Sequence, residues 1–493
     1  MKRRKFITTT SAAAGITIIP RHVLGGIGYI APSDRLNIAC IGNGTQGTRV
    51  MLQLLKLPEI QVIAVADPVK EDTKYQNWGQ YELRDNIRAS IEEPKWDEGV
   101  EGCRAGRIPA QQIVNTWYGK QKGMKYKGCS EFEDFRELLE KLGSLDGVVA
   151  CPPDHQHAQV SIRAMQKGKH VFCQKPMTNS IYEARRMGDL AVSTKLATQV
   201  ATGNVSSEDT DLLCEMLWSG AIGPVRKVIN WSNRPVWQSG FTQLPAAEKI
   251  PDGFNWDLWL GRAEMRPFSY SYAHTVFRSW FDFGTGAIGD MGCYSFGVIF
   301  RALKLGHCET VEASGNTVVG VVNGNPDQLK YVSHPLAMNA HFTFPARAGM
   351  PPVDLFWIDG GLKPPRPGEF EVDGIDFDAD GLLFVGDYGK ILCDFEGGKP
   401  RLIPASTDKA YIRPPASILR SKGHYQDWFI AMKGGPAPRC TFDLAVPITE
   451  ALNLAVISMR TGKKLAWDPV KMTTNVEEAN KLLKPSYRSG WEL

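Results

Sequence analysis

The hydrophobic and polar positions between Leu36 and Asp67 predict a strand, a glycine-rich turn, a helix and a second strand. The run that ends at Ile41 is short and apolar, which is typical of a buried parallel strand. Residues 48–56 then place apolar side chains at helical spacing, and residues 62–66 form a second apolar run. The pattern predicts the first β-α-β unit of a doubly wound sheet.

The turn between the first strand and the helix has the spacing G-x-G-x-x-G, formed by Gly42, Gly44 and Gly47. In such a turn the first glycine permits the tight bend, and the second lets the backbone approach a pyrophosphate. The third lets the helix and the strand pack closely. Because the N-terminus of the helix offers free N–H groups to phosphates, we expect a dinucleotide to bind here, with Thr45 and Gln46 also in contact.

An acidic residue follows the second strand at the spacing that dinucleotide binding requires. Asp67 stands 20 residues after Gly47, where a carboxylate bonds to the hydroxyls of the adenine ribose. The same carboxylate would repel a 2′-phosphate, so we expect the cofactor to be NAD rather than NADP. An ordinary glycine turn would explain the glycines, but not the flanking strands and the acid together.

Strand-like and helix-like segments continue to alternate up to residue 202. Residues 72–128 interrupt this pattern, and we interpret them as a surface insertion. Ser130 and Glu133 form a capping box that predicts a helix through residue 141. Further elements are expected at 147–151 (strand), 154–167 (a helix capped by Asp154), 169–174 (strand), 181–195 (helix) and 197–202 (strand). The alternation indicates a parallel, doubly wound sheet.

From residue 224 onward, strand-like runs dominate and few helices intervene. Strands are expected at 225–232, 310–319, 337–344, 382–385 and 390–395, and helices at 424–432 and 447–461. The proline- and glycine-rich residues 345–381 are expected to form an extended loop. Few helices between strands favour a large, mostly antiparallel open sheet.

These patterns together predict an α/β protein with two domains. Residues 1–33 are expected to be an export signal and linker, and residues 34–176 a Rossmann NAD-binding domain. Residues 177–493 are expected to form a C-terminal α+β domain for substrate binding and oligomerisation. The length of 493 residues agrees, because it exceeds that of a typical single domain.

Composition and charge limit the kinds of molecule that the protein is expected to bind. With 43% hydrophobic and 22% charged residues, the chain has the composition of a soluble globular protein. The net charge of +4 is small, and part of it lies in residues 2–5, so we expect no nucleic-acid partner. The ten cysteines include no C-x-x-C pair, so we expect no metal site. Cys103 and Cys129 are the one pair considered for a disulfide.

The N-terminal residues have the order of a secretory signal. Residues 2–5 are basic, residues 6–19 are mildly apolar, and Pro20 ends the segment. Arg3 and Arg4 resemble the twin-arginine export motif, which predicts a periplasmic protein. Because no clear A-x-A cleavage site follows, an uncleaved segment would serve as a membrane tether. The alternative is a disordered basic tail on a cytoplasmic protein.

Polar residues follow the ends of two expected strands, where ligands bind in an open parallel sheet. The first group follows Cys151 and includes Pro153 and His157, and the second contains Lys175. An ammonium group at this edge would lie beside the nicotinamide and stabilise an alkoxide. The alternative is a lysine that only caps the strand end in solvent.

A third polar group lies in the C-terminal half. After Gly284 and two further glycines, Asp290 opens an expected helix, and Tyr294 follows four residues later on the same face. A carboxylate beside a tyrosine or a lysine can orient a sugar or relay a proton. The alternative is a helix cap followed by a core tyrosine.

Taken together, these motifs resemble the Gfo/Idh/MocA family, named after glucose–fructose oxidoreductase, inositol dehydrogenase and a rhizopine-catabolism protein. The resemblance covers residues 34–493, and residues 256–261, 280–284 and 424–428 resemble its exported bacterial branch. It implies a Rossmann domain followed by an open α/β sheet domain. It also implies a small-molecule sugar substrate and a homo-oligomer, either a dimer or a tetramer.

The resemblance also implies roles for individual residues. Lys175 matches the lysine of the family's E-K-P motif, which contacts substrate and nicotinamide, although glutamine replaces the acid before it. Pro153 and His157 match the T-P-x-x-x-H segment on the nicotinamide side. Asp290 matches the acid of D-x-x-x-H, but Tyr294 replaces the histidine that serves as general base.

The missing histidine leaves three hypotheses for the base. Tyr294 would serve if Lys175 lowers its pKa from the usual ~10. His274, the candidate favoured by sequence proximity, would otherwise take the proton. In the third hypothesis, hydroxyl oxidation is lost and the site only binds.

The leading prediction for function is an NAD-dependent oxidoreductase that transfers a hydride at a ring hydroxyl or keto carbon of a sugar. The alternative is an NAD-dependent glycosidase or lyase that oxidises, eliminates and reduces with no net redox change. A non-catalytic sugar-binding homologue is the third. Aromatic residues that would stack on a sugar or fill the core are Trp231, Trp237, Trp256, Trp259, Trp280 and Phe281.

Overall fold

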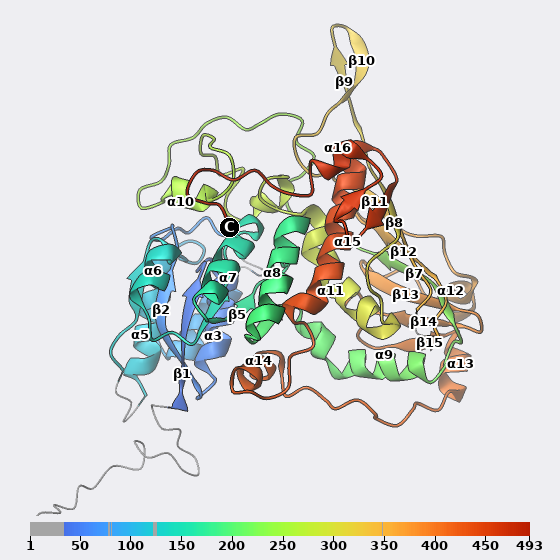
Figure 1. Ribbon diagram of the computed structural model, residues 1–493, viewed down its shortest axis with the longest axis horizontal. Helices are drawn as coiled ribbons and strands as arrows, with labels where there is room; N and C mark the ends of the chain where they lie inside the picture. The colour runs from blue at the N-terminus through green and yellow to red at the C-terminus, as the bar shows by residue number, and fades with distance from the viewer. Residues whose placement is uncertain (1–33, 77–78, 80, 122–125, 348) are drawn as a thin grey trace, which may run out of the picture.

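The computed structural model describes residues 34–76, 79, 81–121, 126–347 and 349–493. The expected export signal, with Arg3 and Arg4, lies outside these ranges. Figure 1 shows two domains side by side, a parallel sheet on the left and a larger mixed sheet on the right, with helices between them. The predicted class, a Rossmann domain followed by an α+β domain with a mostly antiparallel sheet, is confirmed.

The N-terminal domain is built on one parallel sheet. Its elements are β1 (Leu36–Ile41), α3 (Thr45–Leu55), β2 (Ile60–Ala66), α4 (Glu82–Ile91), α5 (Arg107–Gly119), β3 (Ser130–Phe132), α6 (Phe135–Lys141), β4 (Gly147–Ala150), the 3-10 helix η2 (Asp154–Gln156), α7 (His157–Gln166), β5 (His170–Cys173), α8 (Ile181–Thr194) and β6 (Thr198–Val200). The described strands pair in the order β3-β2-β1-β4-β5-β6. The order reverses between β1 and β4, and a doubly wound sheet binds its ligand at such a point. Because β6 belongs to this sheet, the domain extends past the expected boundary at residue 176.

Residues 72–128 are more than a surface insertion, which corrects the prediction. They form α4 and α5, whose apolar faces include Leu83, Ile87 and Ile113 and pack into the core beside β2. The hydroxyl of Tyr118 accepts a hydrogen bond of 3.0 Å from the N–H of Val62 in β2. The segment is therefore the crossover from β2 to β3 and covers one face of the sheet.

Two helix starts differ from the predicted ones. α6 begins after Asp134, whose Oδ1 accepts a hydrogen bond of 2.8 Å from the N–H of Arg136, while Ser130 lies in β3. The predicted capping box is therefore wrong. Asp154 is the first residue of η2, preceded by Pro153, and does not cap a helix with its side chain. Its carboxylate is thereby left for another role.

The C-terminal domain is built on a mixed sheet. Its elements are η3 (Gly203–Ser206), α9 (Glu208–Trp218), β7 (Val225–Trp231), α10 (Trp256–Leu260), η4 (Val276–Ser279), α11 (Gly286–Leu303), β8 (Thr310–Gly315), β9 (Val318–Val322), β10 (Asn325–Leu329), β11 (Met338–Phe344), β12 (Val353–Ile358), α12 (Gly368–Asp373), β13 (Gly381–Gly386), β14 (Lys390–Cys393), β15 (Arg401–Ile403), α13 (Ala405–Ala410), α14 (His424–Met432), α15 (Phe442–Thr461), β16 (Leu465–Asp468), β17 (Thr473–Thr474) and α16 (Glu477–Asn480). The described strands pair in the order β15-β14-β13-β7-β12-β11-β8-β16-β17. Among these pairs, β12 with β7 is parallel and the others are antiparallel.

Four strands of this sheet were missed, namely β12, β15, β16 and β17, and β12 is the one at the centre of the strand order. Residues 345–381, expected as a loop, contain β12, which lies between β7 and β11. Its side chains alternate between buried and half-buried, with Trp357 and Leu355 in the core under α11 and α15. Prolines before and after this short strand conceal it in the sequence.

The helix α15 is long and apolar because it is the core helix of the C-terminal domain. Within the described ranges it alone has the length and composition to cross a membrane, and it is 72% buried inside the protein. It packs against α8, α11 and β8. Cys103 and Cys129 are both buried and free, so the disulfide considered for them is wrong.

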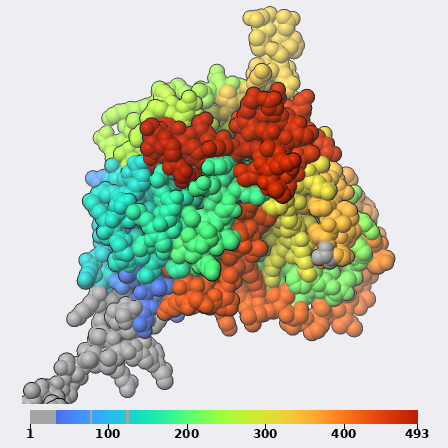
Figure 2. All heavy atoms as spheres, in the orientation of Figure 1, coloured from blue at the N-terminus to red at the C-terminus, as the bar shows by residue number. Residues whose placement is uncertain are grey.

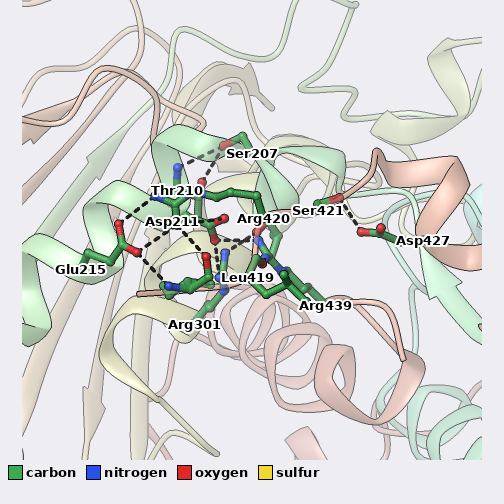
Figure 3. Close-up of polar contacts among 12 residues, drawn as sticks. Ser207, Thr210, Asp211, Glu215, Arg301, Leu419, Arg420, Ser421, Asp427 and Arg439 are labelled. Atoms are coloured by element: carbon green, nitrogen blue, oxygen red, sulfur yellow. Dashed lines mark hydrogen bonds and ion pairs between the residues drawn. The ribbon is translucent and has the colours of Figure 1, made fainter. Parts of the chain in front are cut away.

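Residues 411–441, called the strap here, run from α13 under the molecule to α15 and carry α14 beneath the parallel sheet (Figure 1). Trp428 of α14 packs on Phe172 of β5, with ring centroids 5.7 Å apart. Arginines hold the strap to the C-terminal domain (Figure 3): Arg439 of the strap and Arg301 of α11 lie 2.6 and 2.5 Å from Asp211 Oδ1. The strap therefore joins the two domains.

A hairpin stands away from the body of the protein (Figure 2). It consists of β9 and β10, which pair only with each other within the described chain. Val319 and Val321 of β9 are 66% and 76% exposed. No part of the cleft described below comes from this hairpin.

Candidate functional site

The turn after β1 requires its glycines for steric reasons. Gly42 has φ +83°, and a Cβ there would lie 2.4 Å from the backbone of Cys151 at the end of β4. A Cβ at Gly47 would lie 1.9 Å from the carbonyl oxygen of Gly42. Both contacts are far below van der Waals distance and involve backbone atoms. The predicted glycine roles of tight turn and close packing therefore agree with the geometry.

The N-terminus of α3 has the properties of a phosphate site. Gly44 is the N-cap and supplies no side-chain hydrogen bond, and the first turn holds no acidic residue. Gln46 is exposed there, while Thr45 Oγ1 donates a hydrogen bond of 3.1 Å to the Gln76 carbonyl. The free N–H groups and the positive end of the helix dipole therefore face the cleft without a competing carboxylate, and they fit a pyrophosphate.

Asp67 lies at the end of β2, beside this turn. Its two carboxylate oxygens accept hydrogen bonds from the backbone N–H groups of Asn43 (2.5 Å) and Val69 (2.8 Å). Burial raises the pKa of Asp67 to about 6, although these hydrogen bonds oppose the rise. The carboxylate is held rigidly at the wall of the cleft.

One cleft joins the glycine turn to the strand ends. It contains about 1020 Å³ of space, part of it open to solvent. The glycine turn and Asp67 line one end, and the ends of β4 and β5 line the other. Further lining residues are Tyr75, Pro153, Asp154, His157, Gln174, Lys175, Trp259, His274 and Arg278.

Lys175 and Asp290 meet in the space between the two domains. Lys175 Nζ lies 2.6 Å from Asp290 Oδ1 and donates a second hydrogen bond of 2.8 Å to the Asp290 carbonyl. Arg278 Nε donates to the same Oδ1 at 3.0 Å. Burial favours neutral forms, but the two cations hold the pKa of Asp290 below its ordinary value. Against the same burial effect, Asp290 raises the pKa of Lys175, so both remain charged.

His157 contacts the backbone at the ends of both β4 and β5. Its Nδ1 lies 2.7 Å from the Pro176 carbonyl oxygen, and its Nε2 lies 2.9 Å from that of Pro152. Burial lowers the pKa of His157 to about 4, so the ring is neutral. It holds the end of β5 next to the end of β4, where Pro153 lines the cleft.

Tyr294 lies next to Lys175, but the lysine does not activate it. The ammonium Nζ stands over the tyrosine ring, 4.8 Å from its centroid. Burial raises the pKa of Tyr294 above its ordinary value, and the opposing effect of Lys175 is smaller. The direction of this shift is opposite to the one that the hypothesis of Tyr294 as base requires.

His274 belongs to a different part of the cleft. Its Nε2 lies 3.1 Å from Asp72 Oδ2, and its ring stacks on Tyr75 with centroids 3.5 Å apart. Its described contacts include neither Asp290 nor Tyr294. His274 thus contacts the segment after β2, and the structure does not bring it to the catalytic candidates.

Among the cleft residues that were not predicted as site residues, three have side chains that bear on its chemistry or shape. Arg278, on η4, completes the charge cluster, and nothing in its local sequence marks it. Tyr75 covers the glycine turn, with its ring edge where a Cβ on Gly44 would lie, 2.8 Å away. Asp154 stands inside the segment after β4 that was singled out, but its expected role was a helix cap.

Most of the aromatic residues considered for sugar stacking belong to the core. Trp231, Trp237, Trp256, Trp259 and Trp280 are buried, and Phe281 is half-buried. Trp259 also lines the cleft.

Fold and cleft together define a two-domain protein of the dinucleotide-binding Rossmann class. Residues 110–202 match the family model for "Oxidoreductase family, NAD-binding Rossmann fold", and residues 218–310 match that for "Oxidoreductase family, C-terminal alpha/beta domain". Both models describe the Gfo/Idh/MocA oxidoreductase family, so the resemblance inferred from the motifs is confirmed over these two segments.

Curated relatives match shorter segments. A levoglucosan dehydrogenase of Pseudarthrobacter phenanthrenivorans is 30% identical over 124 residues, 24% of this chain and 32% of the relative. A glycosyl hydrolase family 109 protein of Stenotrophomonas maltophilia is 25% identical over 174 residues, 35% of this chain and 29% of the relative. The chain thus spans about a third or less of these relatives.

Solved structures share the fold over most of the chain. The WlbA dehydrogenase from Bordetella pertussis, in complex with NADH and UDP-GlcNAcA, has a TM-score of 0.54 at 12% identity and covers 88% of this chain and 99% of its own. A levoglucosan dehydrogenase in complex with NADH and L-sorbose has a TM-score of 0.50 at 14% identity, with the same coverage. At these identities the likeness establishes the fold alone.

Proposed function

We propose that this protein is an NAD-dependent oxidoreductase acting on a sugar or sugar derivative at a ring hydroxyl or keto carbon. The observation that carries the proposal is the Lys175–Asp290 pair at 2.6 Å, in which Lys175 lines the same cleft that begins at the glycine turn. The sugar dehydrogenases among the relatives support a carbohydrate substrate.

The residues of the cleft would divide the work as follows. Lys175 would donate a hydrogen bond to the reacting oxygen and stabilise its negative charge. Asp290, fixed by Lys175 and Arg278 through one oxygen, would orient a neighbouring hydroxyl through the other. Pro153, at the end of β4, would hold the nicotinamide, which when bound would supply hydride transfer.

The proposal includes a preference for NAD over NADP at the cofactor end of the cleft. Asp67 would accept hydrogen bonds from the ribose hydroxyls and repel a 2′-phosphate. Arg107, the nearby cation, already pairs with Glu131 at 2.8 Å and with Glu133 at 3.7 Å. We therefore expect NAD to bind more tightly than NADP in a direct titration, and tighter NADP binding would contradict this choice.

The test is a panel of sugars incubated with purified protein and NAD. Suitable probes are D-glucose, N-acetyl-D-glucosamine, D-glucuronate, myo-inositol and levoglucosan, with absorbance of the reduced nicotinamide as the readout. Oxidation that is lost in Lys175→Met supports the proposal. Tight NAD binding with no turnover on a broad panel would favour the non-catalytic homologue instead.

A second candidate function is a redox-neutral glycosidase that keeps its NAD through each turnover. The similarity to a glycosyl hydrolase family 109 protein is the observation that favours it. In this case the protein would be purified with bound NAD, and p-nitrophenyl glycosides would be cleaved without added cofactor and without accumulation of reduced nicotinamide. Cleavage that requires added NAD in stoichiometric amounts would argue against it.

Export by the twin-arginine route, to the periplasm or to a retained membrane tether, belongs to the same proposal. A protein that binds its cofactor in the cytoplasm has to be exported already folded, and this requirement favours the twin-arginine route. Cell fractionation of the full chain and of an Arg3→Lys, Arg4→Lys variant tests it, because only the unmodified chain should leave the cytoplasm.

A further inference from the structure

The geometry leaves the proton acceptor of the proposed reaction unassigned. Tyr294 keeps a raised pKa, and His274 bonds to Asp72 away from the charge cluster. Both ring nitrogens of His157 lie against backbone carbonyl oxygens, at 2.7 and 2.9 Å, and the neutral ring donates to one of them. A further titratable side chain lines the end of the cleft that contains Lys175 and Arg278.

That side chain is Asp154, the first residue of η2, directly after the end of β4. It is 1% exposed and lines the cleft together with Lys175 and Arg278. Its Oδ2 has no hydrogen-bond partner among the described residues. Lys175 and Arg278 both bond to Asp290 instead, and neither forms an ion pair with Asp154 in the described structure.

A buried carboxylate oxygen without a partner is costly, because burial removes its bonds to water and nothing replaces them. Protonation of the carboxyl or a bound hydroxyl group would each relieve this cost. A carboxylate that accepts a proton from a substrate hydroxyl first binds that hydroxyl and then becomes protonated, so it passes through both states.

We propose that Asp154 is the acid–base residue of this site, in place of the histidine that is absent at position 294. The inference rests on the proposed function. During oxidation the substrate O–H bond breaks and its proton passes to Asp154 Oδ2. The electron pair of that bond forms the carbonyl, and the hydrogen on carbon leaves with two electrons to reduce NAD⁺. In the reverse direction, protonated Asp154 returns the proton.

The surroundings of Asp154 suit this role. Burial raises its pKa to about 7, against the pull of Arg278, while Asp290 adds to the rise and Lys175 opposes it. A group that titrates near neutrality both accepts and donates protons efficiently. The titratable and charged groups that face it are Arg278 on η4, Asp290 and Cys293 on α11, Cys173 on β5 and Lys175 after β5.

Asp359 provides a matched control. Burial raises its pKa to about 7 as well, but its oxygens accept hydrogen bonds from the Met338 N–H (2.5 Å) and Trp357 Nε1 (3.0 Å). It does not line the cleft. Asp154 and Asp359 therefore share burial and titration range, and they differ in the unpartnered oxygen and in position.

The experiment compares the full chain with Asp154→Asn, Asp154→Glu and Asp359→Asn. Infrared difference spectra across pH identify the protonated-carboxyl band that disappears in Asp154→Asn, and this readout needs no turnover. Titration with NAD alone measures cofactor affinity. The pH profile of kcat is recorded with whichever sugar of the panel the unmodified protein oxidises fastest.

We expect the Asp154 band to titrate near pH 7, over the range in which the oxidation rate rises as the carboxyl ionises. Asp154→Asn should lower kcat by about 10²–10⁴-fold and abolish this rise, with NAD affinity unchanged. Asp154→Glu should restore part of the rate, and Asp359→Asn should keep the profile.

Three results would overturn the role of Asp154. An unchanged pH profile in Asp154→Asn excludes proton transfer by this residue. A loss of NAD affinity in that variant would mean that Oδ2 serves the cofactor. A band that titrates outside the range of the rate would separate the carboxyl from the reaction. If the unmodified protein oxidises no sugar, the proposed function itself fails, whatever the spectra of Asp154.

Discussion

Replacing Gly47 with alanine tests the cofactor end of the cleft, because the expected damage follows from one distance. The added Cβ would lie 1.9 Å from the Gly42 carbonyl oxygen, whereas ordinary van der Waals contact begins at 3.4 Å. The N-terminus of α3 must therefore move away from the turn by on the order of 1 Å, and such overpacking costs about 1–3 kcal/mol.

The same shift would displace the N–H groups that we expect to hold the pyrophosphate. Losing one hydrogen bond to a charged group costs about 1.5–3 kcal/mol, and each 1.4 kcal/mol is about tenfold in affinity. NAD binding should therefore weaken by roughly 10- to 100-fold or more. Isothermal titration calorimetry with NAD alone measures this, and thermal unfolding without NAD measures the cost to the fold.

Gly143→Ala is the matched control, since a Cβ there meets nothing within 4 Å. It should leave both NAD affinity and the unfolding temperature unchanged. If Gly47→Ala binds NAD as tightly as the unmodified chain, the assignment of this turn to the pyrophosphate is refuted.

Three further changes test other parts of the structure. Lys175→Met should lower sugar oxidation by about 10²–10⁴-fold with little change in NAD affinity, because the ammonium serves the reacting oxygen; equal losses in both quantities would contradict this role. The pKa of Asp67 is raised by burial to about 6, and ribose binding favours the ionised form, so NAD affinity should rise with pH through about 6 and then level off. Asp67→Asn should remove that dependence, which titrations at several pH values would detect. Trp428→Ala, in a side chain that is 0% exposed, should lower the free energy of unfolding by about 3–5 kcal/mol in urea, whereas an unchanged transition would mean that α14 does not support the parallel sheet.

Elements with a strong local pattern were predicted well. The run before Gly42 and the run before Asp67 became β1 and β2, because strands buried on both faces are apolar throughout. β12 was missed, since its six residues lie between prolines and its neighbours β7 and β11 are far away in the sequence. Pairing over such distances leaves no local signal.

The same distinction, between residues with a local sequence signal and residues without one, applies to the site. Lys175 and Asp290 were predicted from their own motifs, and the fold brings them to 2.6 Å. Arg278 has no motif and joins them only because η4 packs beside α11. The pKa of Tyr294 depends on the balance between burial and one nearby cation, a quantity that only the packed structure supplies.

The strap has a consequence for the order of events during synthesis. Trp428 and Phe429 of α14, Phe442 of α15 and Trp491 near the C-terminus all complete cores of the N-terminal domain. Domains usually fold in turn as they leave the ribosome, the N-terminal one first. Here the first domain to emerge must wait for some of the last side chains to be made. A nascent chain halted at residue 202 would still expose Phe172, which α14 covers in the finished fold. The mature cofactor cleft therefore forms only after translation is nearly complete.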